Sequence, residues 1–311
     1  MNFLLAIVSL LAGFSRGNKL IVLTYHRVLA GVDVMYPNEV TVDKFSWQMA
    51  LLDKYFNVLS LSDALEHLKE GTLPPRAVCL SFDDGYASCY TEVLPILKLF
   101  NFSACFFIVS SALNQKGMWN DLIVESVRSI PGDELDLSPL GLGIYSLVNR
   151  AKVAQEIVES VKYLPMAERK IVCNQIVDLA GINMPELMLS SSQLCTMQSE
   201  GMEIGGHTVN HPILKNLTFV EAEYEVSQNK HDLEKILGKP IRFFAYPNGR
   251  LNVDYVSEQV DIVRACGYEA ALTTDWGSID NQSGLWQLPR YTPWDNLPLR
   301  FMFRMMWGYL R

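Results

Sequence analysis

The clearest structural signal in this chain of 311 residues is the segment Ala77-Val78-Cys79-Leu80-Ser81-Phe82-Asp83-Asp84-Gly85-Tyr86. Its first six residues are apolar or small, which predicts a buried parallel strand. Two acids and a glycine follow directly. Active sites of parallel α/β folds gather at the carboxyl ends of the strands, so Asp83 and Asp84 are candidate site residues. The alternative is that Asp-Asp-Gly forms an ordinary turn.

Strands and helices alternate on both sides of this segment. Further strands are predicted at Lys19–Tyr25, Val58–Leu61, Ser103–Val109 and Ala270–Thr273, and helices at Val42–Tyr55, Ser62–Lys69 (with Ser62 as N-cap), Thr91–Leu99 and Val260–Cys266. Strands separated by helices are typical of a parallel α/β sheet or barrel.

Residues 121–189 interrupt this alternation, because they contain no clear strand pattern. Helical periodicity is strong at Val153–Leu164 and Ala167–Leu179. We interpret residues 121–189 as a helical insertion within one domain that spans residues 19–296.

Both ends of the chain are apolar. Residues 1–18 predict either a helix or a weak signal-like segment. Residues 297–311 mix Phe, Met and Trp with Arg, which predicts an amphipathic helix. This helix either packs on the protein or lies at a membrane surface.

Composition limits the classes of function. The chain has a formal net charge of −8 and no run of Lys or Arg, which disfavours nucleic acid as a partner. No stretch reaches the roughly 18–20 apolar residues of a membrane span. Imidazole chemistry must use a short set of five histidines: His26, His67, His207, His211 and His231.

Two of these histidines lie four residues apart in the segment Met202–Pro212. If the segment forms one helical turn, the imidazoles of His207 and His211 face the same side and can share a metal ion. The alternative is a pair of hydrogen-bonded loop histidines. An Asp with two His leaves open positions on the ion, as in catalytic rather than structural sites.

A third signal is the apolar run at Phe243–Ala245, which leads into the turn Tyr246-Pro247-Asn248-Gly249. The backbone N–H groups of such a turn can face an oxyanion. An ordinary Pro/Gly turn is the alternative.

Together these motifs resemble the polysaccharide deacetylases of carbohydrate esterase family 4, the chitooligosaccharide deacetylase-like homology domain. The resemblance covers most of residues 19–295. It implies an α/β fold, a distorted (β/α) barrel with fewer than eight strands, and a divalent metal ion, most often Zn²⁺. The matching segments are Thr24–Val28, Ser81–Tyr86, Pro95–Leu97, Phe106–Val109, Gly201–Leu214, Phe244–Gly249 and Leu288–Arg290.

The resemblance also implies roles for individual residues. Asp83 matches the family's general base. The metal ligands correspond to Asp84, His207 and His211. The backbone N–H at Asn248 matches an oxyanion donor.

The chain departs from the commoner family pattern in its catalytic acid. Many members take this acid from a histidine near the end of the domain, but no histidine follows His231 here. Members with an N-terminal Tyr-His motif, similar to poly-N-acetylglucosamine deacetylases, supply the histidine from the first strand. His26 is therefore the predicted acid, and a structural hydrogen-bonded histidine is the alternative.

A second departure is Ala245, which stands where the family usually has an arginine. We expect Arg290 to replace that arginine in orienting Asp83. Asp275 is expected to support the acid or the arginine.

The resemblance implies a metal-dependent hydrolase that removes N-acetyl groups from an amino-sugar polysaccharide or a lipid-linked glycan, in exopolysaccharide or cell-envelope biosynthesis. One alternative is an O-acetyl esterase or other amide hydrolase at the same metal site. Another is a catalytically silent glycan-binding barrel.

The expected location is the cytoplasm or the inner-membrane surface, with a secreted or periplasmic protein as the alternative. The sequence carries no signal for an oligomeric state.

Overall fold

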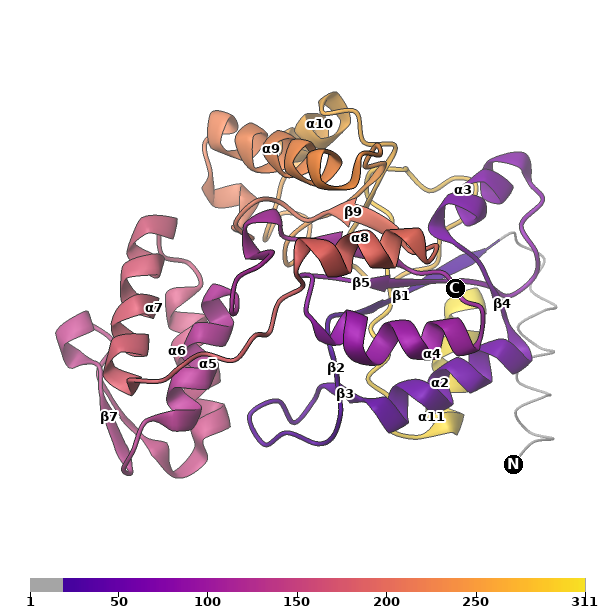
Figure 1. The fold of residues 1–311 in the computed structure, drawn as a ribbon. Coiled ribbons are helices and arrows are strands. Elements are labelled where there is room, and N and C mark those ends of the chain that lie inside the picture. Colours follow the sequence, from indigo (N-terminus) through magenta and orange to yellow (C-terminus); the bar gives the residue numbers. More distant parts are fainter. Residues whose placement is uncertain (1–18, 311) are drawn as a thin grey trace. The chain divides into compact units, whose positions relative to one another are not determined.

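The computed structural model describes residues 19–310, and these residues form two compact units (Figure 1). The first unit contains residues 19–31, 40–113 and 189–310, and the second contains residues 32–39 and 114–188. The predictions for residues 1–18 lie outside the described residues.

The first unit contains all the strands and helices that the alternating pattern predicts. Its elements are β1 (Leu20–Tyr25), β2 (Val28–Leu29), β3 (Val40–Thr41), α2 (Val42–Tyr55), β4 (Asn57–Val58), α3 (Leu61–Glu70), β5 (Ala77–Phe82), α4 (Leu94–Leu99), β6 (Cys105–Ile108), α8 (Ser191–Ser199), β9 (Glu203–Gly206), α9 (Phe219–Leu237), β10 (Phe243–Ala245), α10 (Ser257–Ala265), β11 (Ala270–Leu272) and α11 (Pro298–Leu310).

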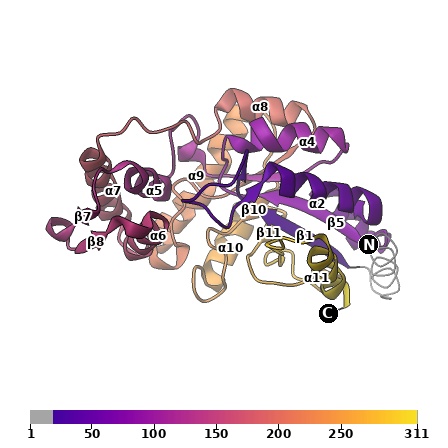
Figure 2. The same cartoon turned by 90° about the horizontal axis from the view of Figure 1, so that it is seen from below.

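Seven described strands form one parallel sheet in the order β1-β5-β6-β9-β10-β11, with β4 beside β5. The segment after β11 runs between the last strand and the first: Leu288 pairs with Leu272, and Tyr291 pairs with Leu23. Figure 2 shows β1, β5, β10 and β11 among the helices that surround them. This arrangement confirms the prediction of a distorted (β/α) barrel with fewer than eight strands.

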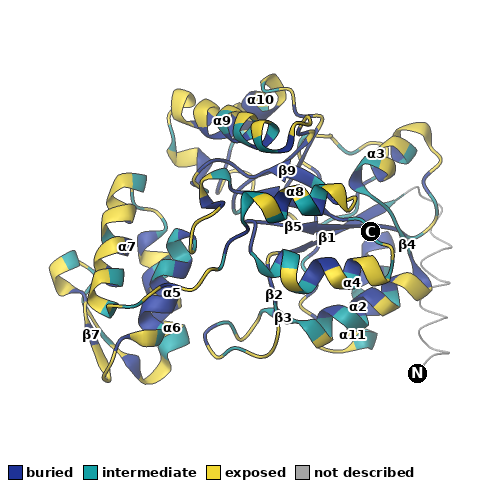
Figure 3. Ribbon diagram, in the orientation of Figure 1, coloured by how far each residue is buried: buried dark blue, intermediate teal, exposed yellow. Residues whose placement is uncertain are grey.

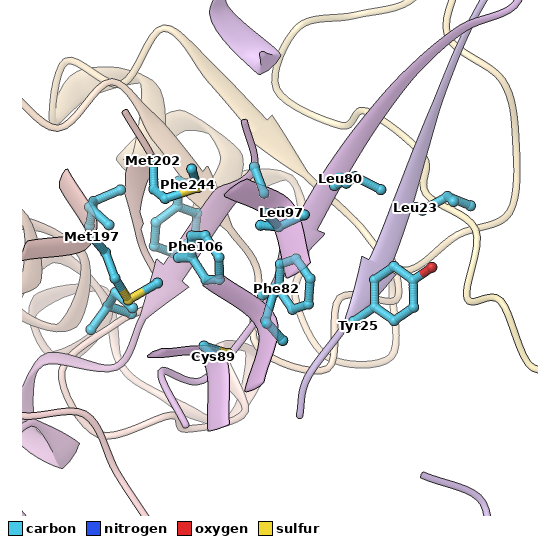
Figure 4. Close-up of a cluster of buried hydrophobic side chains, with 14 of the residues drawn as sticks. Leu23, Tyr25, Leu80, Phe82, Cys89, Leu97, Phe106, Met197, Met202 and Phe244 are labelled. Atoms are coloured by element: carbon cyan, nitrogen blue, oxygen red, sulfur yellow. The ribbon is translucent and has the colours of Figure 1, made fainter. Parts of the chain in front are cut away.

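The strands are buried because helices cover the sheet. Every residue of β1 and β5 is buried, as expected for parallel strands in an α/β fold (Figure 3). The ring of Phe82 stacks on Tyr25 at 5.2 Å and on Phe106 at 4.8 Å (Figure 4). Burial of each such side chain contributes about 1.5–3 kcal/mol. The core therefore fixes the strand ends that carry the polar residues.

Two local boundaries differ from the predictions. The strand predicted at Val58–Leu61 ends at Val58, and α3 already begins at Leu61, because Ser60 rather than Ser62 accepts the capping hydrogen bond. The helix predicted at Thr91–Leu99 begins with a π-helical turn at Cys89–Val93, and α4 follows it.

The second unit is mostly helical and contains α5 (Trp119–Ser129), α6 (Arg150–Val161) and α7 (Met166–Ala180). The expectation that residues 121–189 lack strands was wrong, because β7 (Glu134–Asp136) pairs antiparallel with β8 (Ile144–Ser146). Each strand has only three residues, too few for a period-2 pattern to be visible in the sequence.

The C-terminal helix α11 packs on the first unit against α2 and β1. Phe301, Met302, Met305 and Tyr309 are buried, and the Tyr309 hydroxyl donates to the Ala77 carbonyl at 2.7 Å. This packing agrees with one of the two interpretations of residues 297–311, namely a helix that packs on the protein. The opposite face leaves Phe303 and Trp307 exposed, so contact with a membrane surface stays a prediction. No helix among residues 19–310 is long and apolar enough to span a bilayer.

Candidate active site

The predicted site residues follow the carboxyl ends of neighbouring strands. Asp83 and Asp84 follow β5, and His207 follows β9. The loop after β10 carries Asn248, and His26 comes directly after β1. Because the strands are parallel, these ends meet at one edge of the sheet.

Asp84, His207 and His211 form a cluster whose ligand atoms all lie within 4.8 Å of one another. The Nε2 atom of each histidine lies 3.5 Å from Asp84 Oδ1. Two ligands that bind one ion at bond lengths of about 2.1 Å and tetrahedral angles are about 3.4 Å apart, so the spacing fits a shared cation. Asp84 Oδ1 is buried and has no hydrogen-bond partner among the described residues, which leaves it available to an ion.

The protein backbone fixes the orientation of the His207 ring. Its Nδ1 lies 2.6 Å from the carbonyl oxygen of Ala245. A carbonyl can only accept a hydrogen bond, so Nδ1 carries the proton and Nε2 keeps its lone pair for a metal ion.

The helical turn considered for His207 and His211 does not form. Residues 207–211 form an irregular loop in which Thr208 has φ 67° and His211 has φ 51°. The Thr208 hydroxyl accepts from the His211 N–H at 3.1 Å. The loop, rather than helical periodicity, brings both imidazoles to Asp84.

Asp83 is held by Arg290 in a buried, bidentate ion pair. Arg290 Nη1 and Nη2 donate to the two carboxylate oxygens of Asp83, each at 2.7 Å. The guanidinium also donates to the Thr273 carbonyl and the Ser81 hydroxyl, and its side chain is fully buried. Five N–H donors in a planar fork suit this arrangement better than an ammonium group would. The pair fixes the plane of the Asp83 carboxylate.

The two acids remain ionised despite burial. Burial alone would raise the pKa of Asp83, but the charges of Arg290 and His207 together bring it below its usual value. For Asp84, burial is likewise outweighed, above all by the close approach of His207 and the charge of His211, so its pKa is lowered. Burial disfavours the charged form of His207, but Asp84 and Asp83 raise its pKa above the usual value. The site therefore attracts positive charge.

His26 is exposed at the rim of this site. Its predecessor Tyr25 accepts a hydrogen bond from the Asp83 N–H at 3.0 Å, so His26 and Asp83 follow paired strand ends. The charge of His26 is among the causes that lower the pKa of Asp83 and of Asp84. His26 thus lies near both acids and remains accessible to a substrate.

Asn248 lies in the turn after β10 with φ 58°. Its carbonyl accepts from the Thr274 hydroxyl, whereas its N–H has no acceptor among residues 19–310. At the neighbouring Gly249, a Cβ would lie 2.8 Å from the Thr274 nitrogen, so the close approach of these loops requires glycine.

Asp275 meets Arg290 through its backbone rather than its carboxylate. The Asp275 carbonyl accepts from the Arg290 N–H at 2.9 Å, and the side chain of Asp275 is exposed. The guanidinium donates to Asp83, Ser81 and Thr273, and the Asp275 carboxylate is not among these partners, so the structure does not support the arginine half of the expectation. Support of the acid by Asp275 stays a prediction.

Two groups that shape the site were not predicted from the sequence. The Ala245 carbonyl orients His207, and no side-chain signal marks it. The amide of Asn229, on α9, contacts the loop that carries the histidines. Its place in a helix, on the same face as Val226 and Leu233, gives it the pattern of an ordinary core position.

The arrangement combines a cation site, an ionised buried carboxylate beside it, an accessible imidazole and a free backbone N–H. A cation and a general base can activate water, and a second proton donor can protonate a leaving group. Such a set suits hydrolysis of an amide or ester.

Comparison with known proteins supports a hydrolytic function for this chain. The sequence model of the family described as polysaccharide deacetylase matches residues 70–271. The chain is 20% identical over 273 residues to the Bacillus subtilis protein YxkH, provisionally named a polysaccharide deacetylase, with 88% of this chain and 70% of that protein covered.

A second relative is the poly-β-1,6-N-acetyl-D-glucosamine N-deacetylase of Escherichia coli. It is 39% identical over 70 residues, which are 22% of this chain and only 10% of that protein.

Among solved structures, the Streptococcus pyogenes deacetylase PplD in complex with acetate aligns with a TM-score of 0.63 at 20% identity, and the alignment covers 93% of this chain and 98% of PplD. At this identity the structural likeness concerns the fold.

Proposed function

Because this chain belongs to the polysaccharide deacetylase family, we propose that it removes N-acetyl groups from a glucosamine-based exopolysaccharide. The observation that carries the proposal is the buried Asp83–Arg290 pair beside the cluster of Asp84, His207 and His211. The name of the Escherichia coli relative supports a β-1,6-linked N-acetylglucosamine polymer as the substrate.

The three ligands suit Zn²⁺, which favours tetrahedral sites built from imidazole and carboxylate groups. Held there, the ion would supply Lewis-acid activation of water and of the acetamide carbonyl. Two imidazoles and one carboxylate would leave coordination positions on the ion open for the water and the carbonyl oxygen, as in catalytic sites.

The remaining steps use the chain's own groups. Asp83 removes a proton from the attacking water, and Arg290 holds both carboxylate oxygens so that the base keeps its direction. The N–H of Asn248 donates to the oxyanion that forms at the carbonyl. His26 then protonates the amine nitrogen as the C–N bond breaks.

Acetate release on a substrate panel tests the proposal. The metal-free chain and the chain loaded with Zn²⁺ are each assayed on β-1,6-linked N-acetylglucosamine oligomers, chitooligosaccharides, peptidoglycan fragments and acetylxylan. We expect metal-dependent acetate release, fastest on the β-1,6-linked oligomers. Release from acetylxylan alone would assign an O-acetyl esterase, and no release together with glycan binding would assign a silent binding barrel.

His26→Ala is expected to lower kcat by about 10²–10³-fold, because the leaving amine then lacks its proton donor. The metal content is expected to stay unchanged, since His26 is not among the three ligands. His231→Ala, at an exposed position on α9, is the matched control. Near-wild-type kcat in His26→Ala would rule out His26 as the acid.

Helix α11 supports a membrane-proximal location for this reaction. Arg300, Phe303, Trp307 and Leu310 are exposed and lie along one stripe of the helix, at spacings of three and four residues. Residues 298–310 contain no acid, although the whole chain has a net charge of −8. Aromatic and cationic residues on one helix face suit an anionic lipid surface.

Vesicle sedimentation tests this contact. We expect the chain to sediment with vesicles of phosphatidylcholine and phosphatidylglycerol, and the double variant Phe303→Ser/Trp307→Ser to remain in the supernatant. Phe219→Ser/Tyr224→Ser removes a comparable exposed pair on α9 and is the control. If the wild-type chain does not bind vesicles but forms a dimer that Phe303→Ser/Trp307→Ser dissociates, the stripe mediates self-association instead.

A further inference from the structure

We propose that Asn229 and Glu225, one turn apart on α9, position the 207–211 loop and thereby set the affinity of the site for its cation. The inference rests on the proposed metal site and adds two positioning residues to it. Both side chains are almost completely buried. Residues four apart on a helix lie on the same face, so both can meet one loop.

Asn229 contacts the loop at the first ligand. Its Oδ1 accepts from the His207 N–H at 3.1 Å, and its Nδ2 donates to the carbonyls of Thr208 at 2.6 Å and Ile108 at 3.0 Å. One N–H and two carbonyls can be satisfied by only one orientation of the amide. Asn229 therefore joins the end of β6 to the start of the loop.

Glu225 contacts the loop closer to the second ligand. Its two carboxylate oxygens accept from the Asn210 N–H at 2.8 Å and from Asn210 Nδ2 at 2.7 Å. Its own backbone carbonyl accepts from the Val209 N–H at 3.2 Å. Together with Asn229, it ties the backbone of residues 207–210 to a helix of 19 residues.

The loop needs this support because of its conformation. Thr208 and His211 both have positive φ, a region that residues with a Cβ rarely adopt. Such conformations persist where the surrounding structure holds them. Without the helix contacts, we expect the loop to relax and the two imidazoles to leave the spacing at which they share a cation.

Gly206 shows that space is reserved for the Asn229 amide. A Cβ at this position would lie 2.5 Å from Asn229 Oδ1 and 2.3 Å from the Tyr268 hydroxyl. These separations are too short for any side chain. Glycine at residue 206 thus lets Asn229 reach the His207 N–H, and Gly206→Ala is expected to displace the amide.

Metal affinity tests the inference independently of catalysis. The metal-free full chain is titrated with Zn²⁺ and with Co²⁺ against a competing chelator, and the visible spectrum of Co²⁺ reports the ligand geometry. Loss of groups that orient metal ligands typically weakens binding 10–100-fold, so Asn229→Ala is expected to raise Kd by about this factor and to change the Co²⁺ spectrum. Glu225→Gln and Gly206→Ala are expected to weaken binding in the same direction.

Leu233→Ala is the matched control, because Leu233 is buried on the same helix without contacting the loop by a hydrogen bond. It is expected to lower Tm and leave Kd unchanged. If Asn229→Ala does not fold, Asn229→Asp tests the positioning role in its place. The added negative charge alone would tighten cation binding, whereas loss of the two hydrogen bonds donated by Nδ2 would weaken it. Weaker binding supports positioning, and tighter binding overturns it.

The outcomes separate the inference from the metal site itself. If the wild-type chain binds neither ion, the proposed metal site fails. If the wild type binds, His211→Ala loses binding and Asn229→Ala keeps the wild-type Kd and spectrum, then only the positioning role is overturned.

Discussion

Asp83→Asn is expected to lower kcat/KM for acetate release by about 10³-fold, while the chain still binds its metal ion. The amide cannot accept the proton of the attacking water, and a general base contributes typically about 10²–10⁴-fold to a rate. Asp83 is not among the three candidate ligands, so metal content separates its role from that of Asp84.

The control for this variant is Asp53→Asn, the same change at an exposed position of α2, which is expected to retain full activity. Asp84→Asn is the contrasting variant, because it should lose the metal ion together with the activity. Loss of metal in Asp83→Asn, or activity within a few-fold of wild type, would contradict the assignment of Asp83 as the base.

Arg290→Met is expected to lower the free energy of unfolding by about 3–5 kcal/mol, because it leaves the buried carboxylate of Asp83 without its partner. Both members of the pair are almost fully buried, so solvent screens the interaction little. Urea denaturation measures the change. The double variant Arg290→Met/Asp83→Asn is expected to be more stable than Arg290→Met alone, since it removes the unpaired charge as well.

The same variant should change the pH dependence of catalysis. Without the guanidinium, the burial that raises the pKa of Asp83 is no longer outweighed, so this pKa rises. The base then becomes protonated at a higher pH, and the acidic limb of the kcat/KM profile moves to higher pH. Arg290→Lys keeps the charge but not the bidentate geometry, and is expected to retain part of the stability and less of the rate. An unchanged acidic limb in Arg290→Met would show that Arg290 does not control this base.

Much of the fold was readable from local patterns. The bounds of α2 and β5 agree with the helix and strand predicted there, because hydrophobic periodicity within one element reflects which face is buried. The acids after β5 and the spaced histidines after β9 were recognisable because both follow strands, where parallel folds place their sites. Predictions were less reliable where elements were too short for a period, as at β4, β7 and β8.

The sequence by itself determined the kinds of group in the site: two adjacent acids, two histidines and a Pro/Gly turn. Only the tertiary structure decided how they are oriented. The resemblance led us to expect Arg290 beside Asp83, but the bidentate geometry of the pair, 207 positions apart in sequence, depends on the segment at residues 288–291 running between β11 and β1. The Ala245 carbonyl fixes the His207 ring, because β9 and β10 are neighbours in the sheet. Periodicity acts within one element, whereas these contacts depend on the order of the strands, which no local pattern encodes.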